Sequence, residues 1–408
     1  MRISTPMLNE AAVNAILQDQ SSLSQTQGQL ATGKSINSPS DNPVGEVQLL
    51  QLDAQNSQYQ QYVSNGQSAN TNLTLEESAL STSTTTLQSI RDLVVQANSG
   101  SNNSSDLQNI ATQIGALENQ LQGAANSQNA QGQYLFAGFS SGTQPFVRGA
   151  TGSVAYVGDS GVSTVPLNGG TSVQTGDAGS SVFMNIPAGN GTFTTAVSGG
   201  NTGTGVIDAG TVTNAATWNA AAGTTPPGPP YTITFSDATD YQVTDASGNP
   251  VTSGTYNSAN GGEVAFDGIE VGITGSPAAG DTFTVAPAGK QGVFDTLDNV
   301  VSALNSAGST SAARAQLNTK LNTALQGIDQ ALQQVSTVTS GVGARLSMIS
   351  NVNNSLTSAS TTVQTQISNL SSLDYAAATS QYSQQYIALQ AAEQSYADIG
   401  QLSLFKYL

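Results

Sequence analysis

The feature that most limits how this chain can fold is a heptad of mainly apolar residues near its C-terminal end. One register runs through Leu346, Ile349, Asn353, Leu356, Ser360, Val363, Ile367 and Leu370. This spacing is typical of the buried seam of a long helix that packs against another helix. Asn353 and Ser360 weaken the seam, but polar seam residues also restrict its register.

A second stripe lies in the first quarter of the chain. Leu73, Leu80, Leu87 and Val94 recur every seven residues, and Ile90 supplies an intermediate step. A coiled coil and an antiparallel bundle within one domain give the same pattern, so spacing leaves both open. The two stripes together predict a long helical body.

Shorter helical patterns accompany these stripes. Residues 100–105 form a turn that predicts a helix N-cap at Ser104 or Ser105. Three- and four-residue spacings then mark two helices, through Leu107, Ile110, Ile114, Leu117 and Leu121, and through Leu317, Leu321, Ala324, Ile328, Ala331, Val335 and Val338. Gly341 and Gly343 are predicted to interrupt the second, since each costs about 1 kcal/mol relative to alanine.

The residue inventory excludes most catalytic chemistry. The chain contains no cysteine and no histidine, which rules out thiol nucleophiles, Ser-His-Asp triads and the usual zinc sites. Nine basic against 26 acidic residues give a net charge of −17, which argues against nucleic acid and anionic membranes as partners. We therefore expect no catalytic residue, no cofactor and no metal.

The N-terminal stretch predicts an export route without a cleaved signal. It lacks the apolar core of a signal peptide, and no apolar run reaches the about 20 residues of a membrane span. An external role would therefore need a different way out of the cell.

One motif suggests an enzyme. Gly28 to Ser35, GQLATGKS, matches the phosphate-binding loop of nucleotide hydrolases. That loop needs a buried strand before it, whereas Ile16, Leu23 and Leu30 form a helical stripe there. We favour a helix that reaches Thr32 and is closed by Gly33 in the left-handed conformation, followed by a polar connector and a new helix started by Ser40 or Asp41.

The composition changes between Pro145 and Gly289. This part is rich in glycine, threonine and valine, with short alternating runs at 153–157, 162–167, 231–235, 241–244, 263–266, 269–273 and 282–285. It predicts an all-β insertion, a sandwich or distorted barrel. Trp218 is predicted to anchor the proline-rich loop 224–230; the alternative, a sugar-binding platform, would make the protein a secreted adhesin. Asp237, Asp240 and Asp245 are spaced too loosely for a calcium loop.

Four segments resemble the flagellin family, and within it the hook–filament junction proteins. They are LATGKSINSPSDNPVG at 30–45, GQYLFAG at 132–138, where a short buried strand or corner is expected, FDGIEVGITGSPAAGDTFTVAP at 266–287, and the tail from 370 to 408 with its LDYA, ALQAA and SLF steps. The family's Arg-x-x-x-Gly-x-Arg step is reduced here to Gly343-Ala344-Arg345. A minor filament flagellin is the alternative within the family.

The resemblance implies a structural subunit joining hook to filament, needed for motility and exported by the flagellar type III route. Its implied partners are a ring of like subunits, a hook-associated protein on the hook side, flagellin on the filament side and an export chaperone. Its implied location is the extracellular flagellum.

We therefore expect a mainly α fold with an all-β insertion at the tip of a long antiparallel helical bundle. The predicted division is a terminal assembly domain (1–45 with 371–408), a helical rod (46–144 with 290–370) and an outer β domain (145–289). The residues predicted to form helix seams or assembly contacts are Ile16, Leu23, Leu30, Leu80, Leu87, Ile349, Leu356, Val363, Leu370, Ile387 and Leu404.

Overall fold

The computed structural model describes residues 5–150, 152–222 and 230–401. In the sequence, long helices at both ends of the chain flank a β-rich insertion, which confirms the predicted fold class. The chain divides into two compact units. One holds the described residues up to Ser64 and from Asn351 on, and the other is Asn65–Ser350. Both boundaries fall inside long helices, so the predicted three-part division stays a prediction.

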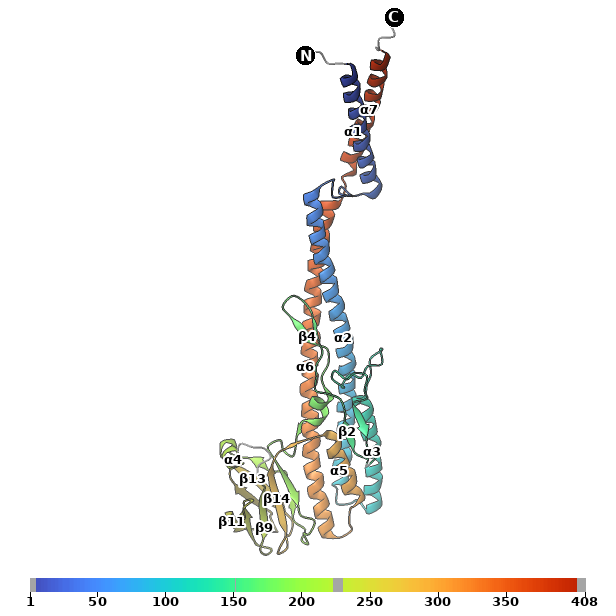
Figure 1. Cartoon of the computed structure of the whole chain (residues 1–408). Coiled ribbons are helices and arrows are strands. Elements are labelled where there is room, and N and C mark those ends of the chain that lie inside the picture. The colour runs from blue at the N-terminus through green and yellow to red at the C-terminus, as the bar shows by residue number, and fades with distance from the viewer. Residues whose placement is uncertain (1–4, 151, 223–229, 402–408) are drawn as a thin grey trace. The chain divides into compact units, whose positions relative to one another are not determined.

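The first unit pairs the two ends of the chain. It contains α1 (Thr5–Thr32), α7 (Tyr375–Gln401), the start of α2 (Pro43–Ala97) and the end of α6 (Ser311–Ser371). Helices α1 and α7 lie side by side (Figure 1), and the Thr26 hydroxyl donates to the Gln385 side-chain oxygen at 2.8 Å. The first and last helical segments therefore pair, as expected of the predicted antiparallel helical bundle.

The connector after α1 is held by the opposite end of the chain. Helix α1 ends at Thr32, and Gly33 has φ +71°, the left-handed conformation expected of it. The Ser35 amide donates to the Ser371 carbonyl at 2.7 Å, and the Leu373 amide donates to the Gly33 carbonyl at 3.1 Å. The two segments that lead into α2 and α7 are therefore hydrogen-bonded to each other.

The start of α2 differs from the expectation. Asn42, rather than Ser40 or Asp41, caps the helix by accepting from the Gly45 amide at 2.9 Å, and Pro43 takes the first helical position. Asp41 instead stabilises the connector, because its carboxylate accepts from the amides of Asn37 and Ser38. These hydrogen bonds hold the pKa of Asp41 below its usual value.

In the second unit, α2 and α6 run antiparallel. Arg91 of α2 pairs with Asp329 of α6 at 2.6 Å, and Asn98 donates to Asn322 at 2.9 Å. Helices α3 (Ser104–Ala125) and α5 (Val293–Asn305) belong to the same unit. The buried α2 residues of this unit include Leu73, Leu80, Leu87, Ile90 and Val94.

Two helix predictions here were wrong. Gly341 and Gly343 do not interrupt α6, which is continuous; Val342 between them is fully buried, and tertiary packing offsets the low helix propensity of glycine. The N-cap of α3 is Asn103, not Ser104 or Ser105. Its side chain accepts from two amides of the first turn, and Asp106 accepts from the Asn103 amide, so both partners satisfy end groups of the helix.

The insertion contains two sheets around one core. The five-stranded sheet has the order β11-β10-β9-β14-β6, and in the other β13 pairs with β12, β7 and β8. The strands are β6 (Phe193–Val197), β7 (Val206–Ile207), β8 (Thr211–Val212), β9 (Tyr231–Phe235), β10 (Asp240–Thr244), β11 (Pro250–Thr255), β12 (Gly262–Phe266), β13 (Ile269–Thr274) and β14 (Thr282–Pro287). Phe193, Phe235 and Phe283 are fully buried in the shared core.

Trp218 belongs to this core. It lies on α4 (Ala215–Ala222), is 2% exposed and packs its ring against Phe193 and Tyr231. A buried ring cannot serve as a platform for a sugar, so this residue gives no support to the adhesin alternative. The loop it was predicted to anchor lies mostly outside the described residues.

Residues 146–187 do not join either sheet. They form β1 (Phe146–Arg148) with β2 (Val154–Tyr156), β3 (Thr164–Pro166) with β4 (Ser172–Gln174), the π-helix η1 (Ser180–Met184), and β5 (Ile186–Pro187) paired with β15 (Lys290–Gln291). The Phe146 ring packs against Phe183 and against Phe294 of α5. This stretch therefore shares a core with the helices, although its composition resembles that of the sheets.

Arg148 connects the β1–β2 hairpin to helices α3 and α5. Its guanidinium donates to the Glu118 carboxylate of α3 at 2.6 Å and lies 3.9 Å from that of Asp298 on α5. Burial raises the pKa of Glu118, and the hydrogen bond from Arg148 opposes that rise. The segment 131–138, expected as a strand or corner, is a corner of turns in which Phe136 and Ala137 are fully buried.

Candidate assembly surface

The first unit exposes many large apolar side chains. We call them the terminal apolar surface; the residues are Met7, Val13 and Leu17 on α1, Val44, Val47 and Leu50 on α2, and Tyr375, Tyr386, Ile387 and Tyr396 on α7. Scattered exposed apolar residues are ordinary, but this many on a few helices point to an interaction surface. By contrast, among the residues of this unit whose burial the structure describes, few apolar side chains are buried: Ile36, Leu49, Leu356, Val363 and Ala378.

The predicted seam residues differ in how deeply they are buried. Leu80, Leu87 and Ile349 are buried in the second unit, and Leu356 and Val363 are buried in the first. Partly buried positions are Ile16, Leu23, Leu30 and Leu370. Ile387 is 64% exposed and belongs to the terminal apolar surface, and Leu404 lies outside the described residues.

Sequence reasoning missed most of the terminal apolar surface. Leu17 immediately follows the stripe residue Ile16, and Tyr386 immediately precedes Ile387. The usable signal is a set of apolar residues adjacent to a stripe, because a single packed partner can cover only one face of a helix. An apolar residue on another face then needs a second partner or remains in water.

The two polar seam residues, Ser360 and Asn353, differ in their hydrogen bonding. The Ser360 hydroxyl donates across the first unit to the Asn56 side-chain oxygen at 2.7 Å. The side-chain oxygen of Asn353 is buried and has no hydrogen-bond partner. Ser360 therefore ties α6 to α2 at one register, as a polar seam residue is expected to do.

The phosphate-loop motif is not built as a phosphate site. Its first five residues, Gly28–Thr32, lie within helix α1 rather than after a strand, and its last three amides already have partners within the chain. The Gly33 amide donates to the Gln29 carbonyl at 2.8 Å, that of Lys34 to the Thr32 hydroxyl at 3.3 Å, and that of Ser35 to the Ser371 carbonyl. A phosphate would have to displace these bonds, so the geometry does not support nucleotide binding.

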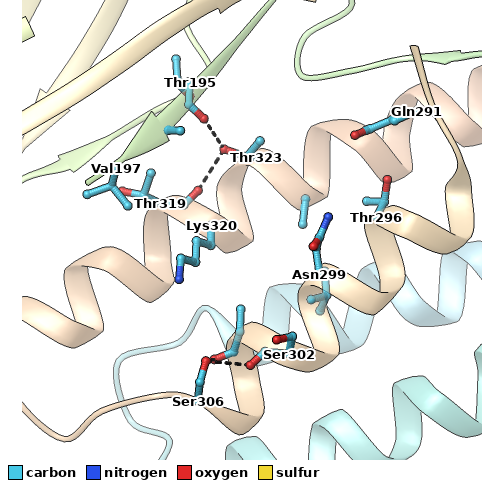
Figure 2. A pocket seen from close by; sticks show the side chains of 14 residues that line it. Thr195, Val197, Gln291, Thr296, Asn299, Ser302, Ser306, Thr319, Lys320 and Thr323 are labelled. Carbon is cyan, nitrogen blue, oxygen red and sulfur yellow. Dashed lines mark hydrogen bonds between the residues drawn. The ribbon is translucent and has the colours of Figure 1, made fainter. Parts of the chain in front are cut away.

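The second unit also contains a cavity. It has a volume of about 340 Å³ and lies between β6, α5 and α6 (Figure 2). Thr323 donates to the Thr195 carbonyl at 3.0 Å across it. Among the described residues that line it, Lys320 is the only titratable one, so the lining offers no acid and base pair for catalysis.

Among the described residues, no three acidic side chains converge to form a metal-binding group. No helix formed by the described residues combines the length and apolar character needed to cross a bilayer.

The fold and this surface define a class of protein. Helices from both chain ends pair in one unit and expose apolar side chains, while a β-rich insertion interrupts the helical part. That is the architecture of a flagellin-like helical subunit. The bacterial flagellin N-terminal helical region matches residues 3–141, and the flagellin C-terminal helical region matches residues 325–408. The D2-like domain of flagellar hook-associated protein 1 matches residues 200–287.

Solved structures show which flagellin-like proteins this chain is similar to. FlgL from Xanthomonas campestris is 32% identical, with a TM-score of 0.69, over 78% of this chain and 98% of that one. Flagellar hook-associated protein 3 from Legionella pneumophila is 30% identical, with a TM-score of 0.71, over 78% and 98%. This chain belongs to the flagellar hook-associated protein 3 (FlgL) family of flagellin-like proteins.

A curated relative agrees with this assignment. Flagellar hook-associated protein 3 of Salmonella typhimurium is 32% identical over 186 residues, which is 46% of this chain. The match spans 58% of the length of that relative. These relatives do not favour the alternative of a minor filament flagellin.

Proposed function

We propose that this chain is a structural subunit of the bacterial flagellum that joins the hook to the flagellin filament and is needed for motility. The observation that carries the proposal is the likeness to solved FlgL chains, 98% of whose length this chain covers at 30–32% identity. The Legionella pneumophila FlgL is described as a flagellar junction protein. A joining subunit of this kind needs no catalytic residue.

The terminal apolar surface would supply the contacts between subunits. Leu17 is 57% exposed and Ile387 is 64% exposed in the free chain. Covering such side chains contributes roughly 25 cal/mol per Å² of apolar surface removed from water. We infer that copies of this chain form a ring, with a hook-associated protein on one side and flagellin on the other.

The route to this place would be the flagellar type III channel, with a chaperone holding the chain before export. The support is the flagellin-type helical regions at both ends. The subunit would then act outside the cell, at the junction between hook and filament.

Charge substitutions on the terminal apolar surface test the proposal. Leu17→Asp and Ile387→Asp should leave the free subunit folded by circular dichroism but prevent it from joining filament to hook. Swimming, and flagellin recovered from the medium instead of on cells, are the measurements. Gln20→Asp and Gln384→Asp are matched controls, because they add the same charge at exposed polar positions of the same helices. Normal filaments in both the Leu17→Asp and the Ile387→Asp variants would contradict a role of this surface in assembly.

Hydrogen exchange on the free subunit tests the same idea physically. Residues 1–40 and 372–408 should exchange faster than Leu73–Leu121 and Leu317–Val338, because marginal helices gain stability mainly from packing. Assembly should slow exchange in the first two segments. Strong protection of both ends in a verified monomer would show that they belong to an internal core.

A further inference from the structure

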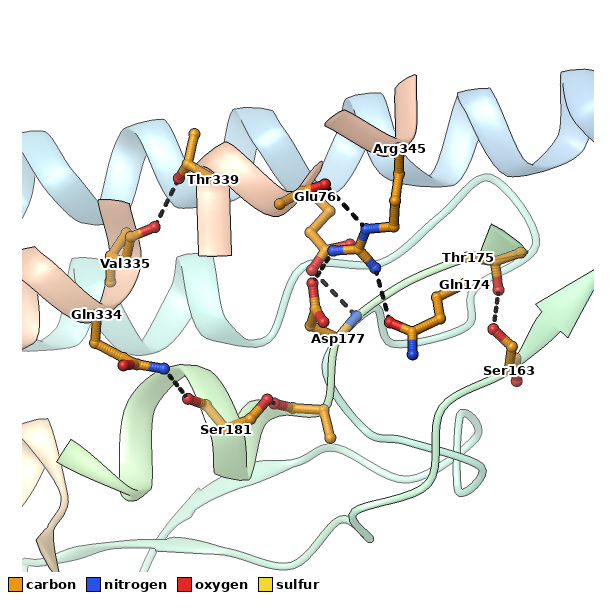
Figure 3. A network of polar contacts seen from close by, with 12 residues as sticks. Glu76, Ser163, Gln174, Thr175, Asp177, Ser181, Gln334, Val335, Thr339 and Arg345 are labelled. Carbon is orange, nitrogen blue, oxygen red and sulfur yellow. Dashed lines mark hydrogen bonds and ion pairs between the residues drawn. The ribbon is translucent and has the colours of Figure 1, made fainter. Parts of the chain in front are cut away.

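A buried group of charged side chains lies in the second unit, where the stretch between β4 and η1 contacts both long helices, α2 and α6. Figure 3 shows Glu76 from α2, Asp177 from the stretch between β4 and η1, and Arg345 from α6. Arg345 forms an ion pair with the Asp177 carboxylate. The Asp177 amide donates to Glu76 Oε1 at 3.1 Å. Arg345 Nη1 also lies 3.5 Å from the Gln174 side-chain oxygen.

The charges in this group do not balance if every member is ionised. One guanidinium faces two carboxyl groups, and it is paired with Asp177. Glu76 is only 1% exposed, and its Oε2 is buried without a hydrogen-bond partner. An ionised carboxylate in that position would be desolvated beside a second negative charge, which is strongly unfavourable.

Protonation of Glu76 removes the imbalance. Burial, helped by the negative charge of Asp177 and opposed by Arg345, raises the pKa of Glu76 to about 9. A neutral carboxylic acid can remain beside the Asp177–Arg345 pair without adding charge. At neutral pH the folded group therefore carries one proton that the unfolded chain does not hold.

We propose that Glu76, Asp177 and Arg345 form a proton-dependent clasp that fastens the segment Ser172–Met184 to α2 and α6. Folding takes up one proton from solvent onto the Glu76 carboxylate. Loss of that proton places two carboxylates against one guanidinium, which weakens this attachment and makes opening of the segment more frequent. A second attachment, from the Gln334 side chain to the Ser181 carbonyl at 2.8 Å, contains no titratable group and does not respond to pH.

The direction of the pH effect follows from the raised pKa. The contribution of Glu76 to stability is fully present below its unfolded pKa of about 4.5 and is lost as pH rises through about 9. Between these values, one proton changes the opening equilibrium by up to about tenfold per pH unit. The protection factor of the Asp177 amide, which bonds to Glu76, should fall with this slope.

Infrared spectroscopy tests the protonation directly. The full chain at pH 7 should show a carbonyl band of a protonated carboxylic acid that disappears in Glu76→Gln. Glu77→Gln is the matched control, because Glu77 is the next residue on α2 and is exposed. A wild-type spectrum at pH 7 identical to that of Glu76→Gln would overturn the proposal.

Hydrogen exchange tests the clasp itself. Glu76→Gln should make the protection of Ser172–Met184 independent of pH between 6 and 9, whereas Glu77→Gln should keep the wild-type slope. Asp177→Asn removes the charge that opposes ionisation of Glu76 and should reduce the slope. An unchanged slope in Glu76→Gln would show that another group controls this segment.

Discussion

Replacing Leu356 by aspartate tests the seam of the first unit. Leu356 is 7% exposed on α6, and burying a leucine contributes about 1.5–3 kcal/mol. Truncation in a packed site costs about 2–5 kcal/mol, and an unpaired buried polar group adds about 1–3 kcal/mol. The described part of this unit contains one basic residue, Lys34 in the connector, so the seam offers the new carboxylate no ion pair.

We therefore expect the variant to lose at least about 3 kcal/mol, which is somewhat more than a hundredfold in amide protection. Exchange should be measured on α6 amides of the first unit, because a chain of two units does not have a single unfolding free energy. Thr357→Asp is the control, since it adds the same charge at an exposed neighbouring position. Equal losses of protection in the two variants would mean that the seam register is wrong.

Three further predictions address the motif, the insertion and the connector. Lys34→Ala should leave nucleotide affinity unchanged in calorimetry, because the wild type should bind none; ATP binding lost in the variant would contradict this. Replacing residues 190–287 by a two-residue turn should keep a cooperative thermal melt of the helices, because Ala188 and Gly289 are already hydrogen-bonded to each other. Deleting residues 144–291 should instead destabilise the helices, because it removes Phe146 from the core that they share. Asp41→Asn should weaken amide protection in the connector; in the wild type that protection should be kept above the unfolded pKa of about 3.8 and lost as pH falls through the lower folded value.

The helical part of the fold was readable from the sequence because packing periodicity is local. The stripe through Leu80 and Leu87 is buried, and so are Leu356 and Val363. Gly33 ends α1 as expected, because only a residue without a side chain adopts the left-handed conformation easily. The glycines inside α6 were misjudged, since the packing that offsets their cost comes from residues far away in the chain.

The insertion was less predictable. Its longer strands, such as Tyr231–Phe235 and Ile269–Thr274, alternate apolar and polar residues and were recognised. Strands of only two residues carry too few side chains to show a period, so β5, β7 and β8 were not. The longer strands β6 and β11 were also missed, whereas the predicted runs at 153–157 and 162–167 contain the short strands β2 and β3. Composition also gave no means to separate the hairpins at 146–187 from the sheets, because both are rich in glycine, serine and threonine.

The sequence by itself determined the order of helices, insertion and helices, the absence of thiol and imidazole chemistry, and the family resemblance, because each depends on residue identity or on spacing within one element. Only the tertiary structure decided which apolar residues stay in water and which charges meet. Leu17 and Ile387 are exposed because α1 and α7 each cover one face of the other. Glu76, Asp177 and Arg345 are far apart in sequence, and only the antiparallel pairing of α2 with α6 brings them together around a passing segment, where burial changes the protonation of one of them.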